Sequence, residues 1–315
     1  MTILLTGSSG FVGRAILRDA QKSGLNIRPV FRSMDDVCVH SNSVLVPDLD
    51  ATTDWALALK DVKVVIHVAA IPYAERKETL ELLNWYRKIN VEGTVNLARQ
   101  ASAQGVKRFI FISSVKVNGE STLIGSPFTA EGEIHPRGAY ALTKAEAELK
   151  LKQITNETGM ELTVIRPPMI YGPGVKGNMS LLVNSVRRGL PLPFGKVNKN
   201  RRSMVSIYNL VDLILVCINH PKAANQTFLI SDGEDLSTSE LLKKIANALG
   251  RPIHLFSFPV ALLSLIAKLI GKSKSSERLL GSLQVDIHIT CELLNWSPSL
   301  SMDEALRRSF GGCGC

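Results

Sequence analysis

The sequence predicts an α/β protein with a doubly wound parallel sheet and a smaller C-terminal lobe. Short, almost entirely apolar segments alternate with helical patterns through the first half, as expected for parallel strands that helices cover on both faces. A glycine-rich turn joins the first of these segments to the first helical pattern. After Arg166 prolines and glycines crowd together and strands become sparser, which indicates a separate lobe. Right-handed crossovers make such a sheet doubly wound.

The elements can be placed one after another along the chain. The expected strands cover residues 2–6, 25–31, 43–46, 62–68, 109–113 and 162–165, and helical patterns cover about residues 12–24, 75–103 and 139–155. We expect one domain over residues 1–166 and a lobe over residues 167–315, from which some late segments return to the sheet. In that lobe Ser237 and Glu240 form a capping box, typical of a helix start, and Gly250 ends the helix.

Composition and charge narrow the class of protein. A chain of 315 residues with 45% hydrophobic and 21% charged residues has ordinary globular values, which excludes a disordered or fibrous protein. The 37 Lys and Arg residues outnumber the 28 Asp and Glu residues, giving a net charge of +9. The basic residues are spread out and are not interleaved with aromatic residues, so we expect an anionic small molecule rather than a nucleic acid.

Cysteine usage and hydropathy indicate a cytoplasmic protein. None of the five cysteines lies in a Cys-x-x-Cys pair, so we expect reduced thiols, and for Cys313 and Cys315 a frayed terminus is preferred over a metal site. No signal-peptide pattern precedes the first strand. The longest apolar stretch, residues 258–270, is too short to span a bilayer. We interpret it as a core helix. The alternative is an interfacial membrane helix flanked by lysines.

The turn after the first strand predicts a Rossmann-type dinucleotide site. Gly7 permits a tight turn, Gly10 lets the backbone approach a diphosphate, and Gly13 permits close helix packing. The helix that begins at Phe11 and Val12 offers unpaired N–H groups to the phosphates. Because the turn lies between a strand and a helix, we expect a nicotinamide dinucleotide there.

The residue after the second strand helps to distinguish NAD from NADP as the expected dinucleotide. An acid at this position takes the ribose hydroxyls of NAD, whereas an arginine suits the 2′-phosphate of NADP. The chain has Arg32 there and no acid before Asp35. We therefore favour NADP(H) over NAD(H). The alternative is that Arg32 stacks on the adenine or faces solvent.

A second motif predicts acid–base chemistry. Tyr140 and Lys144 are four residues apart, on one face of a predicted helix. A cation one turn away is expected to lower the pKa of the phenol, as proton transfer at neutral pH requires. The fifth strand ends at Ser113 and Ser114, at the sheet edge where ligands bind. A serine there can hydrogen-bond the reacting oxygen.

With these motifs the chain resembles an extended short-chain dehydrogenase/reductase of the nucleotide-sugar epimerase, dehydratase and reductase group. The resemblance covers nearly the whole chain. The matching segments are residues 6–13, 48–49, 67–70, 90–94, 113–119, 140–144 and 166–173. One departure is Asn118, which stands where relatives commonly carry tyrosine. This difference is expected to affect the loop and not the catalysis.

The resemblance implies roles for individual residues. Ser114, Tyr140 and Lys144 would form the catalytic triad, and Lys144 would also hold the nicotinamide ribose. Asn90 would support the central helix. The cofactor residues would be Gly7, Gly10, Phe11, Val12, Gly13, Arg32, Asp48, Leu49, Ala69, Ala70, Tyr140 and Lys144.

It also implies a substrate and an assembly. The substrate would be a UDP-sugar held between the lobes by Ser114, Asn178, Arg202 and Arg278. The two arginines are chosen because a guanidinium suits phosphate oxygens. A homodimer through the helices around residues 76–104 and 139–155 is implied as well.

Two reactions at C4 of the sugar remain open. The favoured one is NADPH-dependent reduction of a UDP-4-keto-6-deoxy-N-acetylhexosamine, with Tyr140 as the acid, because Arg32 fits a cofactor exchanged with the NADPH pool. The alternative is a UDP-glucose or UDP-N-acetylglucosamine 4-epimerase with tightly bound NAD. Dehydration is disfavoured, since Val115 and Lys116 stand where an Asp-Glu pair would be expected. A non-catalytic dinucleotide-binding regulator is a remote possibility on the same fold.

Overall fold

The main sheet is parallel and has the strand order β3-β2-β1-β4-β5-β6-β9. The computed structural model describes residues 1–33, 42–73, 78–269 and 273–311. The strands are β1 Thr2–Thr6, β2 Asn26–Phe31, β3 Val44–Leu45, β4 Val62–His67, β5 Arg108–Ile112, β6 Glu161–Arg166 and β9 Gln226–Leu229. The predicted strands thus join in one sheet, and the expectation of a Rossmann-type fold is confirmed.

The centre of the sheet is apolar on both faces. In β1, Ile3 and Leu4 point to opposite faces and belong to two different core clusters. Leu4 lies opposite Val65 of β4, and Ile66 lies opposite Ile110 of β5. The order of strands reverses between β1 and β4, and ligands of such sheets bind beside this point, at the carboxyl ends of the strands.

Helices cover each face of this sheet. One face is covered by α1 Phe11–Lys22 and α8 Ile207–Asn219. The other face is covered by α3 Ala56–Leu59, α5 Thr94–Ala103 and α6 Gly138–Thr158. β9 and α8 follow residue 166 in the chain, yet both pack with the main sheet. The division of the chain at residue 166 stays a prediction.

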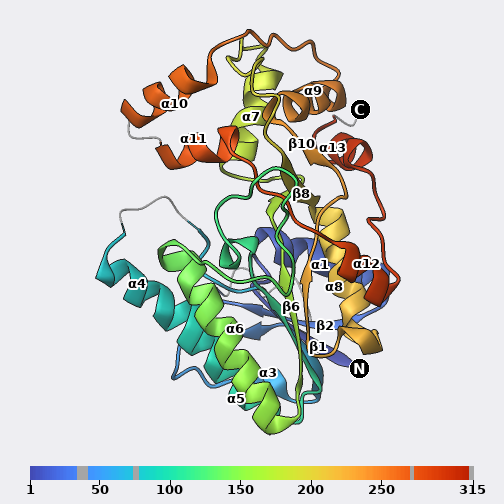
Figure 1. Cartoon of the computed structure of the whole chain (residues 1–315). Helices are drawn as coiled ribbons and strands as arrows, with labels where there is room; N and C mark the ends of the chain where they lie inside the picture. Colours follow the sequence, from blue (N-terminus) through green and yellow to red (C-terminus); the bar gives the residue numbers. More distant parts are fainter. Residues whose placement is uncertain (34–41, 74–77, 270–272, 312–315) are drawn as a thin grey trace.

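The small lobe lies beyond the carboxyl ends of the main strands (Figure 1). Its sheet has the order β10-β8-β7, with β7 and β8 parallel and β10 antiparallel to β8. The elements are β7 Met169–Tyr171, α7 Asn178–Arg187, β8 Arg202–Ser206, β10 Asp235–Leu236, α9 Thr238–Leu249, α10 Val260–Leu269, α11 Ser273–Leu280 and α13 Met302–Phe310. Between α11 and α13, α12 His288–Leu294 returns to the main domain and packs against β9. The capping box of Ser237 and Glu240 is confirmed, and Gly250 ends α9 in the left-handed conformation.

The helical region expected over about residues 75–103 is helical from Leu80 onward, with a π-helical turn in its middle. Residues 75–77 lie outside the described residues, and the rest forms α4 Leu80–Arg87, a π-helical turn at Lys88–Gly93, and α5. The turn packs so tightly that a Cβ atom at Gly93 would lie 2.7 Å from the carbonyl oxygen of Leu49. π-Helical turns are frequent at functional sites. Here the turn places Asn90 so that its Oδ1 accepts a hydrogen bond from the Ile71 N–H.

The interpretation of residues 258–270 as a core helix is wrong. α10 has no buried residue, and it belongs to none of the four core clusters in the described part of the chain. The physical reason is that its packing partner, α11, covers only one side of it. In the ranges given above, no helix is long and apolar enough to cross a membrane.

The described cysteines are free thiols. Cys217 is buried in the core of the main domain, and Cys291 is half-buried. Burial raises the pKa of Cys217 to about 12, so this thiol stays protonated. The expectations for Cys313 and Cys315 fall outside the described residues.

Candidate active site

The glycine turn at the end of β1 forms a tight cradle. Gly7 has φ +74°, and a Cβ atom there would lie 2.8 Å from backbone after β4. A Cβ atom at Gly13 would lie 2.1 Å from the carbonyl oxygen of Gly7. Gly10 is the N-cap of α1 and supplies no side-chain cap, so the N–H groups of Phe11 and Val12 have no partner within the helix. This turn fits a phosphate group.

The other predicted cofactor residues follow the carboxyl ends of neighbouring strands. Arg32 is exposed directly after β2, and Asp48 is exposed after β3. Leu49 is buried, and Ala69 and Ala70 are half-buried after β4. All five therefore lie along the edge that carries the glycine turn. The edge fits a dinucleotide with its diphosphate on α1 and its adenosine beside β2 and β3.

Ser114 and Tyr140 meet at the same edge, after β5 and in the first turn of α6. Burial raises the pKa of Tyr140 to about 12, a hydrogen bond with Ser114 opposes this rise, and the nearby Tyr86 adds to it. The net shift is thus upward, and the lowering of this pKa by Lys144 stays a prediction. Lys144 Nζ donates to the carbonyl oxygen of Ile112 at 2.8 Å.

Lys144 is itself strongly perturbed. Burial lowers its pKa to about 7, and the negative charge of Glu148 opposes the decrease. Its ammonium lies 4.5 Å from the centre of the Phe111 ring. Lys144 thus titrates near neutral pH, so its charge and its hydrogen-bonding capacity depend on pH.

We expect Lys144→Met to stabilise the protein while removing its activity. Between pH 7 and 10.5 the unfolded chain keeps the proton of Lys144 and the folded protein does not, so this group makes stability rise with pH. An apolar replacement removes that penalty, and we expect a gain of about 1–4 kcal/mol at pH 7. Urea unfolding at several pH values measures it. A wild-type pH dependence retained in Lys144→Met would contradict the assignment.

A buried polar network lies beside the predicted catalytic residues. The Ser113 hydroxyl donates to Glu148 Oε1, so this serine belongs to the network. Arg166 donates to both oxygens of Glu148, at 3.0 and 2.5 Å. Its remaining Nη1 donates to Asn118 Oδ1 at 3.1 Å, and Asn118 donates in turn to the Thr129 carbonyl. Asn118, which stands where relatives commonly carry tyrosine, therefore connects the loop after β5 to Arg166 at the end of β6.

Three cations gather near the predicted catalytic residues. Arg202 and Arg278 lie close enough for each to act on the charge of Lys116. Burial lowers the pKa of Arg202 to about 10, and the charge of Arg278 lowers it further. Burial also lowers the pKa of Lys116, although its Nζ lies 2.5 Å from Glu120. One carboxylate thus faces three cations, which leaves a net positive site suited to a diphosphate.

The ring of Tyr73 lies between these cations and Tyr140. Arg278 lies over its ring at 4.3 Å from the centroid, and Lys116 lies at 4.7 Å. The same ring meets Tyr140 edge to face at 6.1 Å between centroids. Asn178 is the half-buried first residue of α7. In the described residues no hydrogen bond connects it to the cations.

Sequence reasoning missed three residues of this site. Lys116 lies two positions after Ser114, and this closeness in the sequence could have identified it as a residue of the site. Tyr73 follows the Ala-Ala segment after β4, which was assigned to the cofactor alone. Glu148 lies four residues after Lys144 and therefore on the same helix face.

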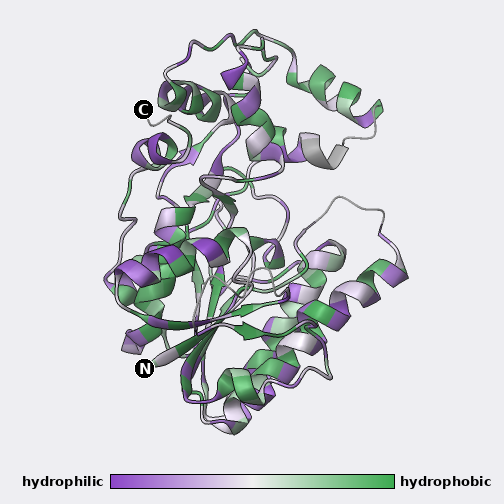
Figure 2. Ribbon diagram, turned by 180° about the vertical axis from the view of Figure 1, so that it is seen from behind, coloured by the Kyte–Doolittle hydropathy of each residue, from purple (hydrophilic) through white to green (hydrophobic). Residues whose placement is uncertain are grey.

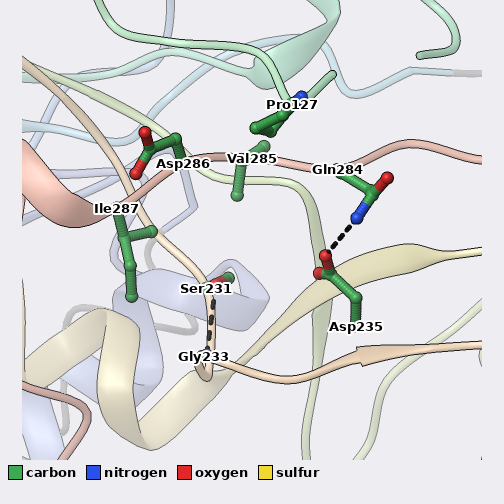
Figure 3. Close-up of a pocket in the computed structure, with 8 residues that line it drawn as sticks. All are labelled: Pro127, Ser231, Gly233, Asp235, Gln284, Val285, Asp286 and Ile287. Atoms are coloured by element: carbon green, nitrogen blue, oxygen red, sulfur yellow. Dashed lines mark hydrogen bonds between the residues drawn. The ribbon is translucent and has the colours of Figure 1, made fainter. Parts of the chain in front are cut away.

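A separate pocket of about 270 Å³ lies between the β9–β10 connection and residues 284–287. Figure 3 shows Gln284 donating to Asp235, at 2.7 Å, and the Gly233 N–H donating to Ser231, at 3.1 Å. Asp235 and Asp286 give this pocket acidic walls, and none of the predicted catalytic residues lines it. It is therefore unsuited to an anionic nucleotide.

The fold and this edge of the sheet place the protein among the extended short-chain dehydrogenases/reductases of the nucleotide-sugar epimerase type. Its family follows from the sequence. Residues 3–231 match the model of the NAD dependent epimerase/dehydratase family, and the chain belongs to this family of enzymes.

Relatives and solved structures are consistent with this placement. The chain is 46% identical to a UDP-glucose 4-epimerase of Vibrio cholerae over 98% of this chain and 94% of the relative. It is 26% identical to an N-acetyl-alpha-D-glucosaminyl-diphospho-ditrans,octacis-undecaprenol 4-epimerase of Escherichia coli O157:H7, over 98% of this chain and 95% of the relative.

Two structures from Bacillus cereus share the fold at 18% identity. A UDP-N-acetylglucosamine 4-epimerase has a TM-score of 0.80 over 98% of this chain and 97% of its own. A UDP-glucuronic acid 4-epimerase in complex with NAD has a TM-score of 0.78 over 99% of this chain and 96% of its own.

Proposed function

We propose that the protein is a UDP-hexose 4-epimerase that uses bound NAD, with Ser114, Tyr140 and Lys144 as its catalytic residues. The observation that carries the proposal is the meeting of Ser114 and Tyr140 at the sheet edge beside Lys144 and the glycine turn. The 46% identity to a UDP-glucose 4-epimerase favours epimerisation over the reduction that the sequence favoured. A cytoplasmic location is part of the proposal.

The side chains have complementary tasks at C4 of the sugar. A nicotinamide dinucleotide held at the glycine turn after β1 would supply the hydride chemistry at C4. Tyr140 Oη takes the proton of the C4 hydroxyl as the carbonyl forms and gives it back when the alcohol is restored. Ser114 hydrogen-bonds the same oxygen. A charged Lys144 favours the phenolate, which counters the effect of burial on Tyr140.

The substrate diphosphate is assigned to the cation cluster. Arg202 and Arg278 present guanidinium groups from the small lobe, and Lys116 adds a third charge from the main domain. The Tyr73 ring lies between the cluster and Tyr140. A diphosphate on the arginines therefore directs the attached sugar toward the catalytic tyrosine. Asn178 is assigned to the uridine on the family resemblance.

The test is conversion of UDP-glucose or UDP-N-acetylglucosamine to the C4 epimer by the purified protein, followed by proton NMR. We expect conversion without net consumption of cofactor. Arg278→Ala is expected to raise KM more than it lowers kcat, because its partner is the diphosphate. Absence of the epimer with both substrates would refute the proposal.

Reduction of a UDP-4-keto-6-deoxy-N-acetylhexosamine is a second candidate. Arg32 favours it, since this exposed side chain follows β2 where a 2′-phosphate of NADP would lie. Absorbance at 340 nm separates the candidates. Stoichiometric loss of NADPH with the 4-keto sugar establishes the reductase.

A homodimer is also part of the proposal, with α4 and α6 at the interface. These helices pack together and expose Leu80, Trp85 and Leu149. We expect Leu149→Arg to shift the protein from dimer to monomer in light scattering, because burying an unpaired charge in an interface is costly. Leu181→Arg, at an exposed leucine of α7, should leave the dimer intact. A monomeric wild-type protein would contradict the interface.

A further inference from the structure

The helix α10 presents its apolar stripe to solvent. Leu262, Leu265, Ile266 and Leu269 follow the spacing i, i+3, i+4, i+7, so they share one helix face. Their exposed fractions are 41%, 53%, 43% and 78%. A surface helix of a globular protein ordinarily turns such a stripe toward the core. In α10 the arrangement is reversed.

The opposite side of α10 holds it to the protein. Leu263, Ser264 and Ala267 are half-buried, and α10 packs against α11. The Pro259 carbonyl accepts hydrogen bonds from the N–H groups of residues 262 and 263, both at 3.1 Å. The apolar stripe is thus the outer face of an anchored helix.

The chain leading into α10 is also anchored, and it extends the apolar surface. The Phe256 N–H donates to the Leu192 carbonyl at 3.0 Å, and its carbonyl accepts from the Gly195 N–H at 3.1 Å. The Phe256 side chain is nevertheless exposed and meets the ring of Phe258 edge to face. An aromatic pair beside an aliphatic stripe is typical of side chains that sit at a lipid–water boundary.

The sequence around α10 is basic, although Lys244 pairs with Glu234 and Asp303 and the packing helix α11 carries Glu277. Residues 241–276 contain no Asp or Glu, and their basic residues are Lys243, Lys244, Arg251, Lys268, Lys272 and Lys274. Lys268 is exposed on α10 itself. The apolar stripe therefore lies within a basic segment, which complements an anionic surface.

The helix stands at the outer end of the small lobe (Figure 1). Figure 2 shows it coloured mostly as hydrophobic, although nothing in the described chain covers its stripe. α11, its packing partner, carries Arg278, whose guanidinium lies over Tyr73 in the candidate active site. A surface bound to α10 would thus lie one helix away from the cation cluster.

We propose that α10 binds the protein reversibly to an anionic lipid bilayer, with its apolar stripe in the headgroup region and the exposed Lys268 on the lipid phosphates. The helix has 10 residues, so it suits an orientation in the plane of the membrane and not across it. A second copy of this chain is a poorer occupant. A symmetric contact would bring two basic segments without acidic residues together.

Vesicle flotation with the full chain tests the proposal. We expect binding to vesicles of phosphatidylcholine with phosphatidylglycerol, little binding to phosphatidylcholine alone, and release by salt. The double variant Leu265→Glu with Ile266→Glu should lose at least about tenfold in partition coefficient. Leu57→Glu, at an exposed leucine of α3 in the main domain, is the matched control and should bind as the wild type does.

Further measurements distinguish a lipid bilayer from a second copy of the chain as the partner of the α10 stripe. Lys268→Ala should weaken binding about fivefold, as expected for one lysine near an anionic surface. Circular dichroism and size-exclusion chromatography show whether the double variant folds and whether its oligomeric state changes. Wild-type protein that fails to float with anionic vesicles overturns the proposal, as does equal flotation of the double variant. A wild-type oligomer that the double variant loses, without vesicle binding, assigns the stripe to a second copy and also overturns it.

Discussion

Tyr140→Phe is expected to lower kcat by about 10²–10⁴-fold while leaving cofactor affinity nearly unchanged. The substitution removes only the hydroxyl that hydrogen-bonds Ser114 and leaves the ring in place between Tyr73 and Tyr86. Because the pKa of Tyr140 is raised to about 12, the phenol holds its proton at neutral pH in this structure. Proton transfer therefore depends on Lys144 being charged when the reaction occurs.

The measurement is kcat for the epimerase and reductase assays, with cofactor affinity from fluorescence titration. Tyr208→Phe is the control, because Tyr208 is a half-buried tyrosine of α8 outside the site. The kcat of wild-type protein should fall toward acid pH, as the Tyr140 phenolate becomes harder to form. Activity retained in Tyr140→Phe would show that another group transfers the proton.

Glu148→Ala is expected to destabilise the folded protein by about 3–5 kcal/mol. The Glu148 carboxylate and the Arg166 guanidinium are both almost completely buried, and their closest atoms are 2.5 Å apart. Removing the carboxylate leaves Arg166 with one side-chain acceptor, Asn118 Oδ1, in the part of the chain described. The Ser113 hydroxyl loses its acceptor as well. An uncompensated buried charge costs far more than an exposed ion pair contributes.

Urea unfolding of the protein measures this loss. The control is Glu146→Ala, two residues earlier on α6, where a more exposed carboxylate pairs with Arg87 at 2.6 Å. There we expect less than about 1 kcal/mol. The double variant Glu148→Leu with Arg166→Met should recover part of the stability, since it removes both charges together. Equal losses at Glu146 and Glu148 would contradict the role assigned to burial.

The fold followed from patterns that are local in the chain. Apolar strands such as Thr2–Thr6 and Arg108–Ile112 could be recognised because side chains on both faces are buried. The glycine turn could be recognised because only glycine tolerates the backbone contacts of Gly7 and Gly13. Tyr140 and Lys144 share a helix, so their spacing alone brought them together.

The surroundings of these residues depended on contacts between distant segments. Spacing placed Lys144 one turn from Tyr140, but the Ile112 carbonyl decided where its ammonium points. The cation cluster combines Lys116 of the main domain with Arg202 and Arg278 of the small lobe, so no local pattern revealed it.

The composition of residues 258–270 predicted an apolar helix, yet whether its stripe is buried or exposed was set by the tertiary structure. The sequence by itself determined the sheet, the glycine turn and the helix that carries Tyr140 and Lys144, because periodicity and backbone sterics act over a few residues. The tertiary structure decided the direction of the pKa shifts of Tyr140 and Lys144, the charge of the cation cluster and the exposure of α10. Burial and Coulomb interactions depend on which atoms are close in space, whatever their separation along the chain.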